Sequence, residues 1–270
     1  MGKTVNYRPF PVSPIQIIFF GNQIIFSIAM EIIKIQEAPS SNTVALEMLG
    51  KQNLSEGTVI WVENQTKGRG QNNNIWQSEP GKNLTFSIIF KPAFLKPENQ
   101  FYLSKVISLG IADYVGLFCS NVAIKWFNDI FIEDKKVAGI LIESLWLGQK
   151  INASVAGIGL NINQDKFPDN LSNAVSLKMK TAVPFVLEKS LRLLYELIIT
   201  RYEQLKSNKF ITIDKDYHSI LYCLGQKCAF LKDNEMFKSV ILGVEPNGYI
   251  KLKHDNDKIM CYGMHEIKML

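Results

Sequence analysis

Between residue 31 and residue 222, short apolar runs alternate with polar loops and with segments of helical periodicity. Apolar residues three and four positions apart predict a helix with Ser41 or Asn42 as its N-cap, an apolar helix within 97–120 and a long helix over about 185–206. Helices interspersed with strands predict an α+β or α/β fold. The runs of strand length cover residues 31–35, 58–63, 84–90, 123–125, 130–132, 137–145 and 151–158.

The residues after about 222 have a different pattern, with short strands separated by turns rich in Asn, Asp, Gly and Pro. Several short strands at such spacing predict a small β-barrel. We therefore expect three parts: an apolar extension over 1–30, a main domain over 31–222 and a barrel domain over 223–270. The strands of this last part are expected at residues 226–231, 237–244, 248–252 and 258–262.

The apolar stretch Ile15–Met30 is open to two interpretations. It resembles the apolar part of a signal peptide, but Gly21, Asn22 and Gln23 interrupt it and no cleavage site is clear. It is also too short to span a bilayer, so we expect no membrane attachment. A β-hairpin or an appended tail is the favoured interpretation.

Composition and charge narrow the function classes. The chain has 270 residues, a net charge of +5 and no dense Lys/Arg tract, which favours anionic small substrates over nucleic acid. The four cysteines form no Cys-x-x-Cys pair, so neither a zinc site nor a disulfide framework is indicated and a cytoplasmic location is expected. All three histidines, His218, His254 and His265, lie in the last quarter of the chain. Chemistry in the main domain must therefore use Lys, Arg, Asp, Glu, amides and a bound ion.

The segment 125–163 gathers charged residues and glycines beside predicted strands. Its lysines supply positive charge, and Asn128 and Asp129 can hold a metal ion. Glycines at strand ends let a ligand approach the backbone. Lys135 alone is typical of a solvated turn, whereas Lys136 adjoins an apolar strand. Together these residues predict a site for an anionic nucleotide.

The loop Gln65-Thr66-Lys67-Gly68-Arg69-Gly70-Gln71 is a second candidate. Glycines on both sides of Arg69 allow a tight turn, while the guanidinium can fork onto a carboxylate or phosphate. Trp76, which follows, can cover a base or hold the loop down. A Gly-Arg-Gly turn alone is more often a solvated loop, but the presence of the segment 125–163 in the same chain strengthens its interpretation as a binding loop.

In this order and spacing, the motifs resemble those of the biotin protein ligase family over about residues 31–270. The resemblance implies a mixed-sheet catalytic domain of the biotin/lipoate ligase type with a small C-terminal β-barrel. It also implies a monofunctional enzyme without a DNA-binding domain. The motifs are Ser40-Ser41-Asn42, the loop 65–70, Trp76, KWFND at 125–129, Lys136-x-x-Gly139-Ile140-Leu141 and GIGLNIN at 157–163.

The resemblance also implies residue roles. Ser40, Ser41 and Gln65 are expected to contact the ureido ring of biotin. Arg69 and Lys136 are the expected catalytic cations, which draw the biotin carboxylate and the α-phosphate of ATP together. The remaining residues implied for biotin binding are Asn42, Gly68, Gly70, Gln71, Gly139 and Gly157. Those implied for ATP are Arg69, Trp76, Lys125, Asn128, Gly159 and Asn161, with Asp129 near magnesium.

The implied reaction forms biotinyl-AMP from biotin and MgATP and then transfers biotin to a lysine of a biotin carboxyl carrier protein. Two anions meet in the first step, and one cation at 4 Å offsets about 4 kcal/mol of their repulsion at an effective dielectric near 20. Arg69, Lys136 and magnesium can position the two anions and offset their repulsion, so the reaction needs no histidine. A homodimer is a further possibility.

Two departures from the family pattern stand out. Family loops usually continue with Arg and Gly after Gly-Arg-Gly, but Asn72, Asn73 and Asn74 follow Gln71 here. Asparagine tolerates left-handed backbone but brings no charge, so we expect weaker retention of biotinyl-AMP. Phe127 stands where proline is usual, which is expected to alter only backbone stiffness.

Structural roles compete with these functional ones. Trp126 and Phe127 are expected in the core. The Ser40–Asn42 segment alone would be a helix N-cap, and Asp129 or Asn161 alone a turn former. Lipoate or octanoate transfer on the same fold is a rival function, disfavoured because the loop lacks an Arg-Arg-x-Ser-Gly-Gly-Gly motif. A non-catalytic nucleotide-binding regulator is the third class, and DNA-binding repressor activity is not expected.

Overall fold

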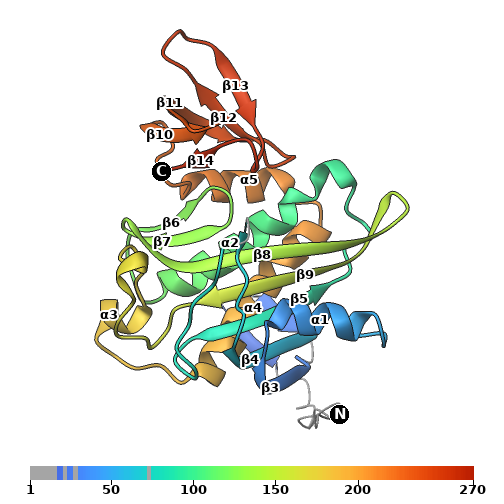
Figure 1. Ribbon diagram of the computed structural model, residues 1–270. Helices are drawn as coiled ribbons and strands as arrows, with labels where there is room; N and C mark the ends of the chain where they lie inside the picture. The colour runs from blue at the N-terminus through green and yellow to red at the C-terminus, as the bar shows by residue number, and fades with distance from the viewer. Residues whose placement is uncertain (1–16, 21–22, 27–29, 72–73) are drawn as a thin grey trace. The chain divides into compact units, whose positions relative to one another are not determined.

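The computed structural model describes residues 17–20, 23–26, 30–71 and 74–270, and these form two compact units (Figure 1). Unit 1 comprises Met1–Ala93, Gly139–Phe167 and Ser176–Glu196. Unit 2 comprises Phe94–Ala138, Pro168–Val175 and Leu197–Leu270. The boundary predicted near residue 222 stays a prediction.

A mixed sheet with the strand order β3-β4-β5-β9-β8 is the framework of unit 1. β3 and β4 are parallel, whereas β4–β5 and β5–β9 are antiparallel. β8 and β9 are consecutive and joined at Gly148, which has a φ of +60°. All of these strands lie where the apolar runs predict them. Their bounds are β3 Ile32–Ala38, β4 Val59–Gln65, β5 Leu84–Phe90, β8 Lys135–Leu147 and β9 Lys150–Leu160.

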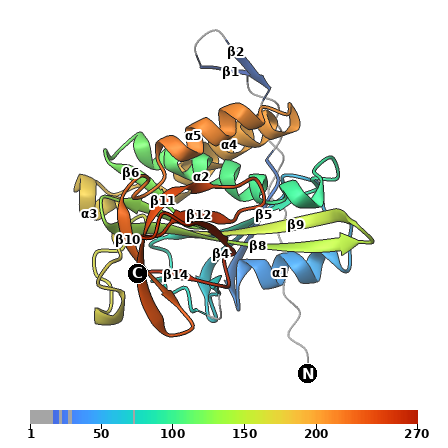
Figure 2. The ribbon, with the colours of Figure 1, turned by 90° about the horizontal axis from the view of Figure 1, so that it is seen from above.

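The helix α1 (Ser41–Leu49) lies against β4, β5 and β9 (Figures 1 and 2). Its N-cap is Ser40, whose Oγ accepts a hydrogen bond from the Thr43 N–H at 3.2 Å. The N-cap thus lies one residue before the first of the two expected caps, Ser41 and Asn42. Ala45 and Met48 bury its inner face in the core under the sheet. Residues 40–42 are therefore fixed between a helix cap and a packed core.

Unit 2 includes the helices α2 and α5, the strands β6 and β7 and the first residues of β8. The strands β6 and β7 form an antiparallel hairpin, and the first residues of β8 follow β7. The helix α2 packs on β6 and β7 and against α5. The bounds are α2 Phe101–Gly116, β6 Val122–Lys125, β7 Asp129–Ile132 and α5 Phe210–Ser219.

The predicted helices are partly corrected. The apolar segment 97–120 is a 3-10 turn, η2 (Pro97–Asn99), followed by α2, which ends at Gly116. The long helix is confirmed as α4 (Leu187–Lys206), whose residues belong to both units. A second 3-10 turn, η3 (Asp169–Leu171), and two short helices, α3 (Leu177–Thr181) and α5, were not anticipated.

The C-terminal strands form an open antiparallel sheet with the order β13-β12-β11-β10-β14. Four of them confirm the expected short strands, but the expectation of a closed barrel was wrong, since β13 and β14 are the two edges. β14 pairs with β10 through only two residues, too few to give a periodic signal. The bounds are β10 Lys227–Lys232, β11 Glu235–Val244, β12 Ile250–Lys253, β13 Ile259–Tyr262 and β14 Lys268–Met269.

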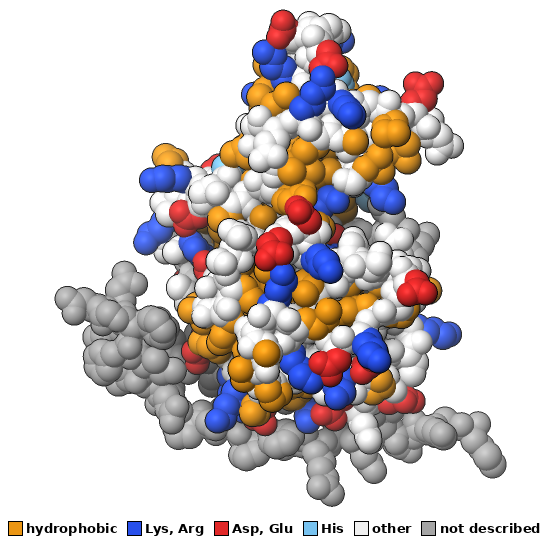
Figure 3. Space-filling model, turned by 90° about the vertical axis from the view of Figure 1, so that its left-hand side faces the viewer, with side chains coloured by type: hydrophobic (Ala, Val, Ile, Leu, Met, Phe, Trp, Pro, Cys, Tyr) orange, Lys and Arg blue, Asp and Glu red, His pale blue; other side chains and the backbone are white. Residues whose placement is uncertain are grey.

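Near the N-terminus, β1 (Ile17–Phe20) and β2 (Gln23–Phe26) pair as an antiparallel hairpin, as the favoured interpretation predicts (Figure 2). The remainder of the apolar extension up to residue 29 lies outside the described residues. Among the described residues, no helix is long and apolar enough to cross a membrane. On the face drawn in Figure 3, basic and acidic side chains lie interspersed.

Candidate functional site

A buried polar cluster in unit 1 surrounds the start of α1. Ser40, Ser41 and Asn42 are almost fully buried, and Ser87 on β5 is wholly buried beside them. The Ser41 backbone N–H donates to Gln65 Oε1 at 2.7 Å, which brings the end of β4 to the helix. Three of the residues expected around the ureido ring, Ser40, Ser41 and Gln65, therefore lie together in the structure.

The hydroxyl of Ser87 determines which atoms of this cluster donate hydrogen bonds and which accept them. Its Oγ lies 2.6 Å from Asn42 Oδ1 and 2.8 Å from Ser41 Oγ. The amide oxygen only accepts, so Ser87 donates its single hydrogen to Asn42, and Ser41 in turn donates to Ser87. Lone pairs on Ser41 Oγ and the amide donors of Gln65 Nε2 then remain for other partners, since Nε2 makes no hydrogen bond among the described residues. The cluster presents both acceptors and donors.

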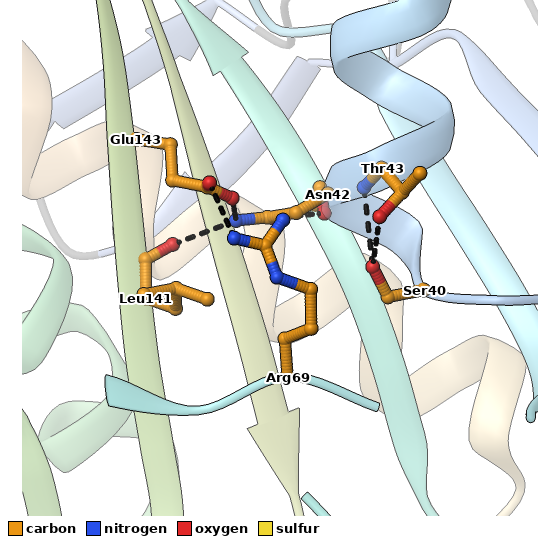
Figure 4. Close-up of polar contacts among 7 residues, drawn as sticks. Ser40, Asn42, Thr43, Arg69, Leu141 and Glu143 are labelled. Carbon is orange, nitrogen blue, oxygen red and sulfur yellow. Dashed lines mark hydrogen bonds and ion pairs between the residues drawn. The ribbon is translucent and has the colours of Figure 1, made fainter. Parts of the chain in front are cut away.

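Glu143 on β8 links this cluster to the Gly-Arg-Gly loop (Figure 4). Its Oε2 accepts from Asn42 Nδ2 at 2.8 Å, and its Oε1 pairs with Arg69 Nη2 at 2.8 Å. Asn42 Nδ2 also donates to the Leu141 carbonyl at 3.1 Å. Arg69 is therefore held in unit 1 by a chain of contacts that begins in the buried cluster.

Backbone contacts close the loop around Arg69. The Trp76 N–H donates to the Gly68 carbonyl at 3.1 Å, and Arg69 forms a bridge with Ile75. The Gly70 N–H donates to the Asn74 carbonyl at 2.7 Å, and the Asn74 N–H donates to Gln71 at 3.0 Å. Gly68, Gly70 and Gln71 thus lie beside Arg69 as predicted by the motif. Asn72 and Asn73, where the loop departs from the family pattern, lie outside the described residues.

Two positions on β9 must be glycine because neighbouring side chains lie close to the backbone there. A Cβ at Gly157 would collide with the Asn42 amide, and one at Gly159 would collide with the ring of Trp76. Asn42 and Trp76, predicted near biotin and the nucleotide, therefore lie against the same strand. Asn161 is buried after the end of β9 and accepts from the Leu177 N–H at 3.1 Å. Gly139 is buried on β8, on the same face as Leu141 and Glu143.

A second charged group lies in unit 2 on the β6–β7 hairpin. Lys125 and Asp129 are paired residues of the hairpin, and Lys136 Nζ lies 2.7 Å from Asp129 Oδ1. Burial lowers the pKa of Lys125 below its usual value, and the nearby Asp129 partly opposes this shift. Two cations thus share one carboxylate, which leaves a net positive charge suited to phosphate.

The remaining residues of the KWFND motif, Trp126, Phe127 and Asn128, are partly or fully buried. Trp126 is buried, and its Nε1 donates to the Gly248 carbonyl at 2.9 Å, which confirms the expectation that it belongs to the core. Phe127 is only half-buried, so its placement in the core was wrong. Asn128 is half-buried in the turn that precedes β7. Among the residues that the structure describes, no group of three or more His, Cys, Asp or Glu side chains surrounds a possible metal position.

The predicted residues therefore form two groups, one in each unit. Ser40, Ser41, Asn42 and Gln65 lie together in unit 1, Arg69 is linked to them through Glu143, and Gly157, Gly159 and Trp76 adjoin them. Lys125, Asp129 and Lys136 are together in unit 2. Sequence reasoning missed Glu143 and Ser87. The signal for Glu143 was its position two and four residues after Leu141 and Gly139 on one face of a strand.

Comparisons with known proteins show which sequences and structures the chain resembles. Residues 34–161 match the model of the biotin/lipoate A/B protein ligase family. The bifunctional ligase/repressor BirA of Bacillus spizizenii is 29% identical over 224 residues, covering 81% of this chain and 68% of the relative. The biotin–[acetyl-CoA-carboxylase] ligase of Paracoccus denitrificans is 33% identical over 129 residues, 46% of this chain and 51% of the relative.

A solved structure shows the same fold. The biotin protein ligase from Aquifex aeolicus in complex with biotin and ATP has a TM-score of 0.75 at 24% identity. The match covers 88% of this chain and 98% of that one. The mixed sheet with its helices and the separate C-terminal sheet are therefore those of a biotin ligase fold. Residues 34–161 thus match the biotin/lipoate A/B protein ligase family, and the relatives and the solved structure that the chain resembles are named as biotin ligases, in line with its motifs.

Proposed function

We propose that the protein activates biotin with ATP as biotinyl-AMP and transfers the biotinyl group to a lysine of a biotin carboxyl carrier protein. The observation that carries this proposal is the polar cluster of unit 1 with Arg69 attached to it through Glu143 and Asn42. Relatives named as biotin ligases and a solved relative that binds biotin and ATP support the choice of substrates.

The cluster has the chemistry that a ureido ring requires. A ureido group presents one carbonyl oxygen and two N–H donors, so a selective site needs a donor and an acceptor in fixed positions. Gln65 Nε2 offers the donor and Ser41 Oγ the acceptor, and buried neighbours hold both. A lipoyl or octanoyl chain has no such polar head, so these buried groups favour biotin over the rival acyl substrates.

The cations have the chemistry that adenylation requires. The carboxylate of biotin attacks the α-phosphorus of ATP, the bond to pyrophosphate breaks, and biotinyl-AMP forms. Arg69 can fork onto the carboxylate, while Lys125 and Lys136 carry charge for the phosphates. In the second step, a lysine amine of the carrier attacks the acyl carbon and AMP leaves with the electron pair of the broken bond.

The unit 2 group offers one carboxylate, that of Asp129, as a possible ligand for magnesium. Mg²⁺ in nucleotide sites is usually held by one or two carboxylates together with phosphate oxygens and waters. Asp129 offers one carboxylate, of which Oδ1 faces Lys136. We therefore infer that Asp129 contributes at most one direct ligand to an ion held mainly by ATP, whose charge it would help neutralise.

Biotin-dependent exchange of pyrophosphate into ATP tests the proposal. The protein is incubated with MgATP, labelled pyrophosphate and either biotin, lipoate, octanoate or no acid. Exchange that requires biotin is the expected result, because only adenylation of the acid returns label to ATP. Exchange with lipoate or octanoate instead would favour the rival acyl transferases, and no exchange with any acid would favour a binding-only regulator.

A further inference from the structure

Glu143 is a half-buried carboxylate that joins two segments far apart in the sequence (Figure 4). One oxygen pairs with Arg69 on the loop and the other accepts from Asn42 at the start of α1, both at 2.8 Å. Asn42 and Arg69 lie in the first segment of unit 1, Met1–Ala93, and Glu143 lies in the second, Gly139–Phe167. A single side chain on β8 therefore sets the relation between the loop and the helix.

The Asn42 side of this link is rigid. Both hydrogens of Asn42 Nδ2 are used, one by Glu143 and one by the Leu141 carbonyl, and Oδ1 accepts from the buried Ser87. Gly157 leaves no space for the amide to move toward β9. Asn42 thus anchors Glu143 rather than presenting a free polar atom to a ligand. Any part that Asn42, an expected biotin-binding residue, has in binding therefore runs through Glu143.

The Arg69 side of the link is adaptable. The Arg69 side chain is 47% exposed, and Nη2 pairs with Glu143. Among the described residues, its other guanidinium nitrogens make no hydrogen bond. A long free arginine loses conformational entropy when it binds a ligand, and a carboxylate that already fixes one nitrogen removes part of that cost. The remaining N–H edge can then fork onto an anion.

We propose that Glu143 is a positioning residue that orients Arg69 for the carboxylate of biotin, an inference that rests on the proposed function. A part-exposed ion pair contributes little to folding, so its value lies in holding the guanidinium. Glu143 acts through Arg69 and does not itself touch the substrate. Substitution of Glu143 should therefore weaken biotin binding only while Arg69 is present.

A double-mutant cycle tests this directly. The dissociation constant of biotin, measured by titration calorimetry without turnover, is compared for Glu143→Gln in the wild-type and Arg69→Ala backgrounds. Glutamine keeps the shape but cannot accept from both partners, so we expect about a tenfold rise in the dissociation constant in the wild-type background. In the Arg69→Ala background, the same change should alter it by less than about twofold.

The matched control is Glu63→Gln, which removes a carboxylate that pairs with Lys34 at 2.8 Å in the same sheet and should leave the dissociation constant unchanged. Equal effects of Glu143→Gln in both backgrounds would show a general structural role and overturn the inference, as would no effect in either. Failure of the wild-type protein to bind biotin at all would instead overturn the proposed function. Thermal unfolding of each variant identifies any that fail to fold.

Discussion

Arg69 in unit 1 and Lys105 in unit 2 are both cations held by one carboxylate, yet their surroundings differ. The Arg69 side chain is about half exposed and pairs with Glu143 at 2.8 Å. Lys105 is wholly buried and pairs with Asp214 at 2.6 Å. Its Nζ also lies 3.5 Å from the Val244 carbonyl and beside aromatic rings of α2 and α5.

The difference shows how a binding cation is told from a structural one. Burial lowers the pKa of Lys105, and the contact with Asp214 opposes the shift, so the buried charge depends on its partner. The Lys105 ammonium is thus engaged by a carboxylate, a carbonyl and aromatic rings. Arg69 keeps donors for an incoming anion. A charged group in a sequence is thus a functional candidate when the fold leaves its hydrogen-bonding capacity unfilled.

The largest expected effect is on catalysis by Arg69. Arg69→Ala should lower biotin-dependent pyrophosphate exchange by about 100-fold or more, because one donor to the developing charge is lost. Its free energy of unfolding should change by less than about 1 kcal/mol, since the pair is part-exposed. Arg192→Ala is the matched control, because Arg192 is similarly exposed and pairs with Glu188. Retained exchange in Arg69→Ala would remove Arg69 from the site.

The second effect is on the free energy of unfolding and concerns the buried ion pair of Lys105 and Asp214. Asp214→Ala should lower the free energy of unfolding by about 3 kcal/mol, since it leaves Lys105 buried without its carboxylate. Glu143→Gln should change it by less than about 1 kcal/mol. Urea unfolding of both variants measures the contrast. Equal losses of stability would contradict the distinction between the two pairs.

A smaller effect should appear in the pH dependence of ATP binding. Burial lowers the pKa of Lys125, so this lysine loses its proton at a lower pH than an ordinary lysine as the pH rises. The KM for ATP should therefore increase on the alkaline side, by up to about tenfold per pH unit. Lys125→Arg should flatten this increase, because arginine stays charged. Superimposable profiles for wild type and Lys125→Arg would exclude Lys125 from phosphate binding.

The smallest effect concerns the asparagines of the loop. The double variant Asn72→Arg and Asn74→Arg adds positive charge shortly after Arg69 in the sequence and should slow release of biotinyl-AMP by a factor of a few, with weaker slowing at high salt. Quenched-flow measurement of the adenylate compares the two proteins. An unchanged release rate at low salt would show that charge in this loop does not retain the intermediate.

Much of the fold could be predicted because its strands have clear periodicity. The bounds of β5 agree with the apolar run at 84–90, and the turn between β8 and β9 falls at Gly148, between the predicted strands 137–145 and 151–158. The open C-terminal sheet could not be anticipated, since closure depends on long-range pairing at the edges and β14 has only two residues. The cap at Ser40 was missed by one residue because three adjacent polar residues can each cap a helix.

The candidate site was only partly predictable for a related reason. Arg69, Lys136 and the glycines stand in motifs, whereas the position of Glu143 on one face of β8 indicates its side of the strand but not its partners. Its contacts with Asn42 and Arg69 span about a hundred and about seventy residues of sequence. Hydrogen bonds of this range depend on strand register and helix placement. Only the folded chain reveals that Glu143 joins the helix to the loop.

Intact-mass analysis of a biotin carboxyl carrier domain tests the central claim most directly. The domain is incubated with the protein, biotin and MgATP, and with a domain whose acceptor lysine is replaced by arginine as a control. The account predicts that the intact domain gains the mass of one biotinyl group, that this gain requires biotin and ATP, and that the lysine-free domain gains nothing. A carrier domain that keeps its mass while the protein is folded and binds both substrates would contradict the account.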